Sequence, residues 1–144
     1  MTNNMKKIVF ILVILMAGTG ANSYAQTGDQ NANLKVSADQ VIEVYYFHMS
    51  RRCSTCLAVE AESEVALKNL YPAQMESGQI TFQSLNLEEE INEPLAKRLQ
   101  VSGQTLLIVK GDKKIDLTGD GFTYARTNPE KLQEKFKTSI DPLL

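Results

Sequence analysis

The stretch VIEVYYFHMSRRCSTC, residues 41–56, decides the fold. Apart from Glu43, residues 41–47 are β-branched or aromatic, so both alternating faces of this segment are apolar. The pattern predicts a central strand that is covered on both sides. A polar loop, residues 48–52, separates this strand from the cysteine motif at 53–56. Residues 57–70 hold strong helix formers and neither Gly nor Pro, which predicts a helix directly after the cysteines.

Further segments with strand or helix patterns follow along the chain. They are a strand at 80–87, a helix from the Glu88-Glu89-Glu90 run through Leu99, a strand at 105–109, a strand at 114–117 after a Gly111-Asp112 turn, and a helix opened by Asn128-Pro129-Glu130. The segment 116–121 contains the Asp and Gly residues typical of a turn.

This order of elements predicts an α/β fold. Strand–helix–strand units favour parallel pairing through right-handed crossovers, and the late hairpin adds an antiparallel edge. We therefore expect a three-layer sandwich with a central mixed sheet of about four strands and helices on both faces.

Length and composition narrow the function classes. The chain has 144 residues, which favours one domain. Its formal net charge of −2 offers no basic surplus for a broad nucleic-acid-binding face, so we expect no nucleic-acid partner. Two cysteines supply neither a disulfide-dense scaffold nor four thiolate ligands for a structural zinc ion.

The first 25 residues have the pattern of a secretory signal peptide. Lys6 and Lys7 precede an apolar run, residues 8–17, and Ser23-Tyr24-Ala25 provides a small-residue cleavage site. We expect a signal peptide at 1–25, a flexible leader at 26–37 and a domain at 38–144, in an exported bacterial protein that is periplasmic or secreted. The alternative is an uncleaved anchor, although the apolar run would span about 15 Å, half of a ~30 Å hydrocarbon layer. An oxidising compartment favours paired cysteines.

The Cys53–Cys56 pair lies where a strand leads into a helix. A spacing of three residues brings both sulfur atoms to the first helical turn, where they can form a reversible bridge. Helix N–H groups and the adjacent Arg51 and Arg52 favour a thiolate, and so does His48 when it is protonated. These features predict thiol-disulfide exchange in which Cys53 is the nucleophile and Cys56 resolves the mixed disulfide.

With these motifs the chain resembles the thioredoxin-like superfamily over residues 38–140. The similar segments are 41–47, 53–56 with the following helix, Asn86-Leu87-Glu88, 101–109 and Lys113-Lys114. Tyr46-Phe47-His48 and residues 51–56 further resemble a bacterial ArsF-like family, described as subunits of a nitrophenyl compound nitroreductase. This resemblance implies a thioredoxin-like fold, no cofactor of the chain's own, and a protein thiol or disulfide partner such as a membrane or envelope redox enzyme.

Two departures from the thioredoxin pattern concern the site. Gln104 stands where thioredoxins have a cis-proline. A cis bond before a non-proline residue costs about 2.5–4 kcal/mol, so we expect a trans bond before Gln104. We also expect an altered substrate surface at Gly103-Gln104-Thr105. Tyr46 or Phe47 stands where thioredoxins have a buried aspartate. Glu43 lies about 13 Å back along the strand, so no carboxylate is expected to take the proton of Cys56.

Two alternatives use the same cysteines. One is a static disulfide in a non-catalytic interaction domain, although so small a loop constrains the unfolded chain little. The other is a copper- or arsenic-related accessory protein in which Cys53 and Cys56, with His48 and Met49, bind a soft metal ion. The redox interpretation implies no bound metal, and contact with a membrane only through an uncleaved signal segment.

Overall fold

The computed structural model describes residues 40–144, and its centre is a four-stranded sheet in the order β2-β1-β3-β4. The strands are β1 (Ile42–His48), β2 (Ile80–Asn86), β3 (Thr105–Lys110) and β4 (Lys113–Asp116). β1 pairs with β2 in parallel and with β3 antiparallel, and β3 and β4 form an antiparallel hairpin. A mixed sheet of four strands agrees with the sequence expectation, although the direction of β3 differs from it.

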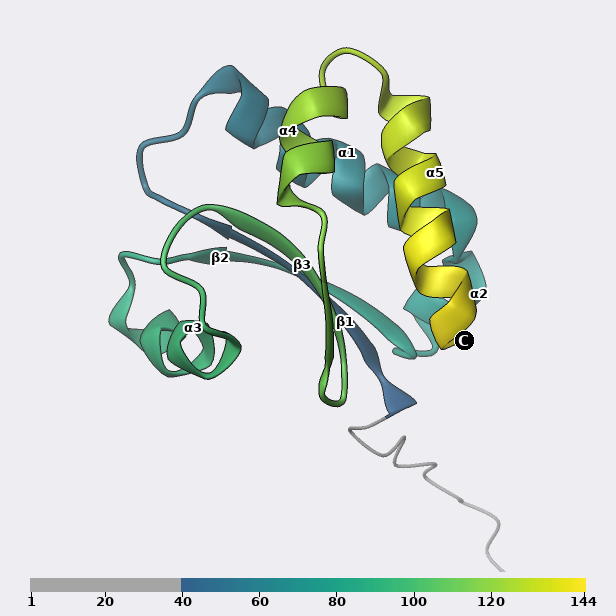
Figure 1. The fold of residues 1–144 in the computed structure, drawn as a ribbon, viewed down its shortest axis with the longest axis horizontal. Coiled ribbons are helices and arrows are strands. Elements are labelled where there is room, and N and C mark those ends of the chain that lie inside the picture. Colours follow the sequence, from purple (N-terminus) through teal and green to yellow (C-terminus); the bar gives the residue numbers. More distant parts are fainter. Residues whose placement is uncertain (1–39) are drawn as a thin grey trace, which may run out of the picture. The chain divides into compact units, whose positions relative to one another are not determined.

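Helices cover both faces of this sheet. They are α1 (Ser54–Leu70), α2 (Pro72–Glu76), α3 (Glu93–Leu99), α4 (Thr118–Tyr124) and α5 (Pro129–Ile140), with short 3₁₀ turns η2 (Glu90–Asn92) and η3 (Asp141–Leu143). Figure 1 shows α3 on one face and α1, α4 and α5 on the other. The expected three-layer α/β sandwich, with a central mixed sheet and helices on both faces, is therefore confirmed.

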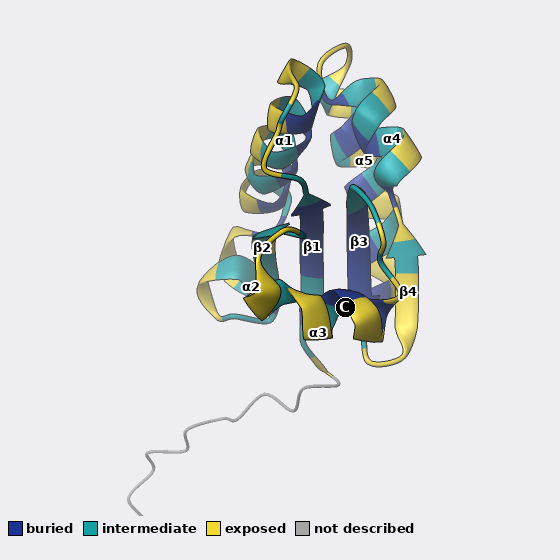
Figure 2. Cartoon of the chain, turned by 90° about the vertical axis from the view of Figure 1, so that its left-hand side faces the viewer, coloured by how far each residue is buried: buried dark blue, intermediate teal, exposed yellow. Residues whose placement is uncertain are grey.

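β1 is buried on both faces, as its sequence predicts. Val44 and Tyr46 pack in the core beneath α1 and α5, whereas Tyr45 and Phe47 pack in a smaller core beneath α3. In Figure 2, β1 and β3 are dark blue along most of their length, while much of β4 is exposed. This double burial fixes the strand, and with it the point at which the chain leaves the sheet for α1.

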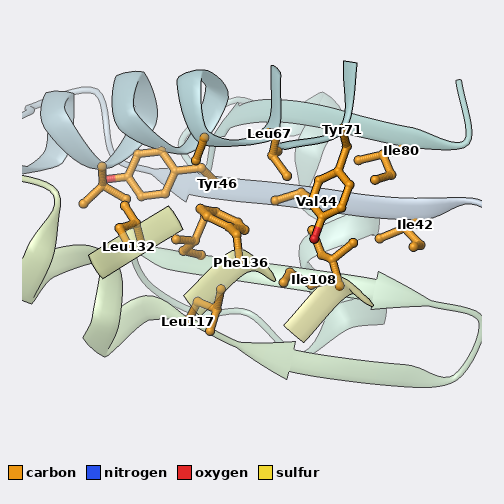
Figure 3. Close-up of a cluster of buried hydrophobic side chains, with 14 of the residues drawn as sticks. Ile42, Val44, Tyr46, Leu67, Tyr71, Ile80, Ile108, Leu117, Leu132 and Phe136 are labelled. Carbon is orange, nitrogen blue, oxygen red and sulfur yellow. The ribbon is translucent and has the colours of Figure 1, made fainter. Parts of the chain in front are cut away.

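The larger core joins β1 to the last helix. Leu132, Phe136 and Ile140 recur every four residues along α5 and are fully buried, and Figure 3 shows Leu132 and Phe136 beside Tyr46. The Asn128 side chain caps this helix by accepting a hydrogen bond from the Lys131 N–H at 3.1 Å. The start and the core face of α5 are thus as predicted.

The direction of β3 corrects the expected parallel pairing. β3 is antiparallel to β1 because α3, with seven residues, is about 10 Å long and cannot carry the chain back along the roughly 23 Å of β2. The chain turns at Gln100, whose φ of 61° is left-handed, and β3 then begins with Thr105 opposite Phe47. Residues 103–105 therefore lie at the edge where β1 ends.

The helix expected from Glu88 begins later than predicted. The Glu88 carboxylate accepts a hydrogen bond from the Ser50 N–H at 2.9 Å, which holds this residue in the loop beside the end of β1. α3 itself starts at Glu93, with Pro94 in its first turn, a position that suits the fixed φ of proline.

Two short helices, α2 and α4, are absent from the sequence expectation. Pro72, expected only to end the preceding helix, opens α2. α4 occupies part of the segment predicted as a turn, because the missing side chain of Gly121 lets the helix close against Val59 and Leu106. A Cβ added at Gly121 would lie 3.1 Å from Leu106 and 3.2 Å from Val59.

The expected signal peptide at 1–25, the leader at 26–37 and the first two residues of the expected domain lie outside the described residues. Within residues 40–144, each helix is too short or too polar to cross a bilayer.

We expect Gly121→Val to destabilise the domain by about 1–3 kcal/mol, because the added side chain overpacks the contact of α4 with α1 and β3. Gly119→Ala in the same helix is the matched control, since an added Cβ meets no atom within 4 Å. It should leave stability unchanged or raise it by up to about 1 kcal/mol. Urea unfolding followed by circular dichroism measures both; equal effects of the two substitutions would contradict this packing.

Candidate active site

Cys53 is the N-cap of α1. Its backbone is extended (φ −86°, ψ 168°), and its sulfur accepts a hydrogen bond from the Cys56 N–H at 3.3 Å. Ser, Thr, Asp and Asn usually perform this role with an oxygen atom, so here a thiol replaces the capping group. The cap points the Cys53 sulfur at the unpaired N–H groups of the first helical turn.

The two sulfur atoms lie 2.6 Å apart, as the cysteine spacing predicts. The two cysteines are not joined by a disulfide, and they differ in access: Cys53 is exposed, whereas Cys56 is 2% exposed and faces the core together with Val59. An external disulfide can therefore reach Cys53, and Cys56 can be reached from Cys53.

The Cys53 pKa is lowered by its surroundings. The largest cause is the hydrogen bond from the Cys56 thiol, followed by the Cys56 backbone N–H, with a smaller contribution from the Thr55 N–H. Slight burial acts in the opposite direction. The thiolate is thus favoured by the helix N-terminus and by the partner thiol, in agreement with the proposed nucleophile.

Arg52, expected beside the Cys53 sulfur, makes its polar contacts elsewhere. Its guanidinium forms an ion pair with Glu60 and donates a hydrogen bond to the Cys56 carbonyl oxygen at 3.4 Å. It also lies over the Tyr46 ring, 5.7 Å from the centroid. Because Glu60 compensates its charge, Arg52 ties the loop to α1 and is not among the causes that lower the Cys53 pKa.

Glu60 belongs to the site, although its sequence pattern did not predict this. It lies one helical turn after Cys56, so an i, i+4 spacing places both on neighbouring positions of α1. Partial burial raises the pKa of Glu60, but the nearby Ser84 hydroxyl and Arg52 guanidinium outweigh this effect, and the net pKa is lowered. A charged carboxylate therefore does lie near the pair, neutralised by an arginine.

Tyr46 occupies one of the two positions at which the thioredoxin pattern has an aspartate. It is fully buried, and its hydroxyl has no hydrogen-bond partner among residues 40–144. Burial, with a smaller contribution from a charged Cys56, raises the pKa of Tyr46 to about 12 despite the nearby Arg52. The phenol therefore stays protonated at neutral pH and cannot take a proton from Cys56.

The loop before β3 reaches the cysteines from the other side. The Cys56 thiol donates a hydrogen bond to Oε1 of Gln104 at 3.3 Å. The peptide bond before Gln104 is trans, as predicted. The Thr105 hydroxyl donates to the Gly103 carbonyl at 3.0 Å and closes the turn. The three residues expected opposite the pair are thus present there, and Gln104 contacts a sulfur atom.

The remaining candidate residues lie around the loop. His48 ends β1, with its Nδ1 3.0 Å from the Met49 carbonyl oxygen, and Arg51 is exposed. A further cation, Arg126, which follows α4, donates to the Ser54 hydroxyl at 3.2 Å. The sequence gives no local signal for Arg126, because α4 brings it to the start of α1.

The soft-metal alternative would require ligands grouped around the pair. Within the part of the chain that the structure describes, no group of three or more His, Cys, Asp and Glu side chains is placed to hold a metal ion.

Comparisons with known proteins give similarity in fold only. No family model matches the chain, and no curated protein matches it. One similar solved structure is that of a malarial protein, with 21% identity over 51% of this chain and 74% of that one, at a TM-score of 0.37. Another is the germline-specific thioredoxin Deadhead from Drosophila melanogaster, with 16% identity over 70% of this chain and 83% of that one, at a TM-score of 0.44. The ArsF-like family stays a prediction.

We expect the thiolate of Cys53 to depend on the hydrogen bond from residue 56. Cys56→Ser keeps a donor at this position, so Cys53 should be alkylated with a pH midpoint below the ~8.5 of a free thiol. Cys56→Ala removes the donor and should raise the midpoint. The measurement is the rate of iodoacetamide alkylation against pH. Identical midpoints in the two variants, or faster alkylation of Cys56 in Cys53→Ser, would refute this order of reactivity.

We expect the Arg52–Glu60 ion pair to stabilise the domain at neutral pH. The side chains are 18% and 29% exposed, so the coupling should be about 1 kcal/mol, between the values of surface and buried pairs. A double-mutant cycle with Arg52→Gln and Glu60→Gln in urea unfolding measures it.

The pH dependence of this pair has a definite sign. Because the folded-state pKa of Glu60 lies below its unfolded value of about 4.3, the stabilisation is complete above that value and is lost as the pH falls through the folded pKa. Wild type and Glu60→Gln should therefore differ at pH 7 and converge in acid. A difference that persists at pH 2 would show that the charge of Glu60 is not the cause.

Proposed function

We propose that this chain is an exported thiol-disulfide exchange protein that passes electrons to or from a partner protein through Cys53 and Cys56. The observation that carries the proposal is the pairing of an exposed cysteine of lowered pKa with a buried cysteine 2.6 Å away, at the start of a helix. A static bridge needs neither a lowered pKa nor an accessible sulfur.

The exchange needs only these two residues and a partner disulfide. The Cys53 thiolate attacks one partner sulfur, forms a mixed disulfide and releases the other partner sulfur as a thiolate, which takes up a proton. The Cys56 thiol then loses its proton, and its thiolate attacks the Cys53 sulfur. The Cys53–Cys56 bond forms, the bond to the partner breaks, and the second partner thiolate leaves. Two cysteines are oxidised and one partner disulfide is reduced; the reverse sequence oxidises a partner dithiol.

Two features of the sequence support the proposed compartment and partner. The Lys-Lys, apolar-run and Ser-Tyr-Ala pattern supports export to an oxidising compartment. The resemblance of residues 46–48 and 51–56 to the ArsF-like family supports a redox enzyme of the cell envelope as the partner. Gln104 in place of proline and the neutral Tyr46 near the pair support a narrow partner range rather than a general reductase.

We expect Cys56→Ser, expressed with its native N-terminus in a bacterial cell envelope, to accumulate as a mixed disulfide with its partner, because residue 56 can no longer resolve the bond. Non-reducing electrophoresis and mass spectrometry identify the captured protein. Cys53→Ser is the matched control and should capture none. Capture by Cys53→Ser, or by neither variant, would contradict the proposed exchange, and an N-terminus at Met1 rather than Gln26 would contradict export.

A further inference from the structure

The buried thiol of Cys56 has two hydrogen-bond acceptors and one proton. The Cys53 sulfur lies 2.6 Å away, and Oε1 of Gln104 lies 3.3 Å away. When Cys53 is a thiolate, the Cys56 S–H bonds to it, and this bond is the largest cause of the lowered Cys53 pKa. When Cys53 is joined to a partner sulfur, it is no longer a thiolate. Of the two acceptors, only Gln104 is then left for the Cys56 thiol.

Gln104 reaches this thiol from a different part of the chain. The loop before β3 supplies it, because β3 begins at the edge where β1 ends. Cys56 is 2% exposed, so water cannot easily replace a lost partner at its sulfur. A glutamine can also do what a proline cannot: its amide oxygen accepts from a thiol, and after half a turn its NH₂ group donates to a thiolate.

Resting on the proposed exchange function, we propose that Gln104 is a positioning residue for Cys56. Its amide oxygen accepts from the Cys56 thiol whenever Cys53 is not a thiolate, and its NH₂ group stabilises the Cys56 thiolate that forms in the mixed disulfide. In the Cys53–Cys56 disulfide, the Cys56 sulfur has no proton to donate, so the hydrogen bond from the Cys56 thiol to Gln104 is lost when this disulfide forms. Gln104 therefore favours the dithiol over the disulfide and makes the protein a stronger oxidant than it would be without the amide.

The thiolate contact acts on the resolving step. As Cys56 loses its proton, the Gln104 amide turns and donates to the sulfur, which then attacks Cys53, forms the intramolecular bond and expels the partner thiolate. Charged or titratable groups near Cys56 include Arg52, which donates to the Cys56 carbonyl, and its ion-pair partner Glu60. Tyr46 and the neighbouring His48 lie on β1, and Arg126, which follows α4, donates to Ser54 at the start of α1.

The first test is the equilibrium of reduced and oxidised protein in glutathione or dithiothreitol buffers. Gln104→Met keeps a side chain of similar length without the amide. We expect its equilibrium constant to shift about fivefold toward the disulfide, which is about 20 mV at 29.6 mV per tenfold change. Ser102→Ala, at an exposed position of the same loop, is the matched control and should not shift the constant.

The second test uses Gln104→Glu, which keeps an acceptor but loses the donor and adds a charge. The added negative charge disfavours a second negative charge on the Cys56 sulfur, so resolution of a glutathione mixed disulfide should be about threefold slower. The slower resolution should appear as the pH rises through the pKa of the new carboxylate, because only the ionised carboxylate carries the charge. A purely structural role of residue 104 would not produce this pH profile.

The outcomes separate the two proposals. A wild-type protein that forms no intramolecular disulfide in either buffer overturns both the exchange function and the role of Gln104. A wild-type protein that exchanges normally, with a Gln104→Met equilibrium constant equal to that of Ser102→Ala, overturns the role of Gln104 alone. Should Gln104→Met fail to fold, as judged by circular dichroism, the Gln104→Glu pH profile decides: no pH-dependent slowing overturns the proposal.

Discussion

The burial of β1 on both faces is the constraint on which the rest of the molecule depends. Val44 and Tyr46 fill one core, and Tyr45 and Phe47 fill the other, so the strand cannot slip in register without exposing both sets. The chain leaves this fixed strand at His48 and starts α1 six residues later at Ser54. The position of the cysteines is therefore set by the sheet rather than by the loop between them.

The two sides of the cysteine pair have different chemistry. On one side, Arg52 of the loop, Glu60 of α1 and Tyr46 of β1 form a compensated group of cation, carboxylate and neutral phenol. On the side of β3, Gln104 offers a neutral amide directly to the Cys56 sulfur. The buried Cys56 thiol is thus next to a compensated ion pair and a neutral amide. The exposed Cys53 receives hydrogen bonds that favour its thiolate. This asymmetry suits a pair in which one sulfur starts the reaction and the other completes it.

The sequence predicted those features of the fold and the site that depend on interactions between neighbouring residues. The apolar faces of residues 41–47, the cysteines at a helix start and the Asn128 cap of α5 follow from side-chain type and spacing, and the structure confirms each. The trans bond before Gln104 follows from the cost of a cis bond without proline, and it is also confirmed.

The sequence did not predict those features that depend on how separate segments of the chain pack together. The antiparallel direction of β3 depends on the length of α3 and the turn at Gln100, and α4 exists because Gly121 lets it approach Val59. Arg52 was expected to act on Cys53 from its sequence neighbourhood, but Glu60, eight residues away, is its ion-pair partner. Sequence adjacency indicates which charges are near a thiol, and only the fold shows which of them are already compensated.

The reaction of the reduced protein with oxidised glutathione tests the central claim most directly. Acid quenching at successive times, followed by peptide mapping, shows where glutathione is attached. The account predicts that glutathione adds first to Cys53 and is then released as the Cys53–Cys56 disulfide forms. First addition at Cys56, or glutathione that stays on Cys53 without an intramolecular disulfide, would contradict the account.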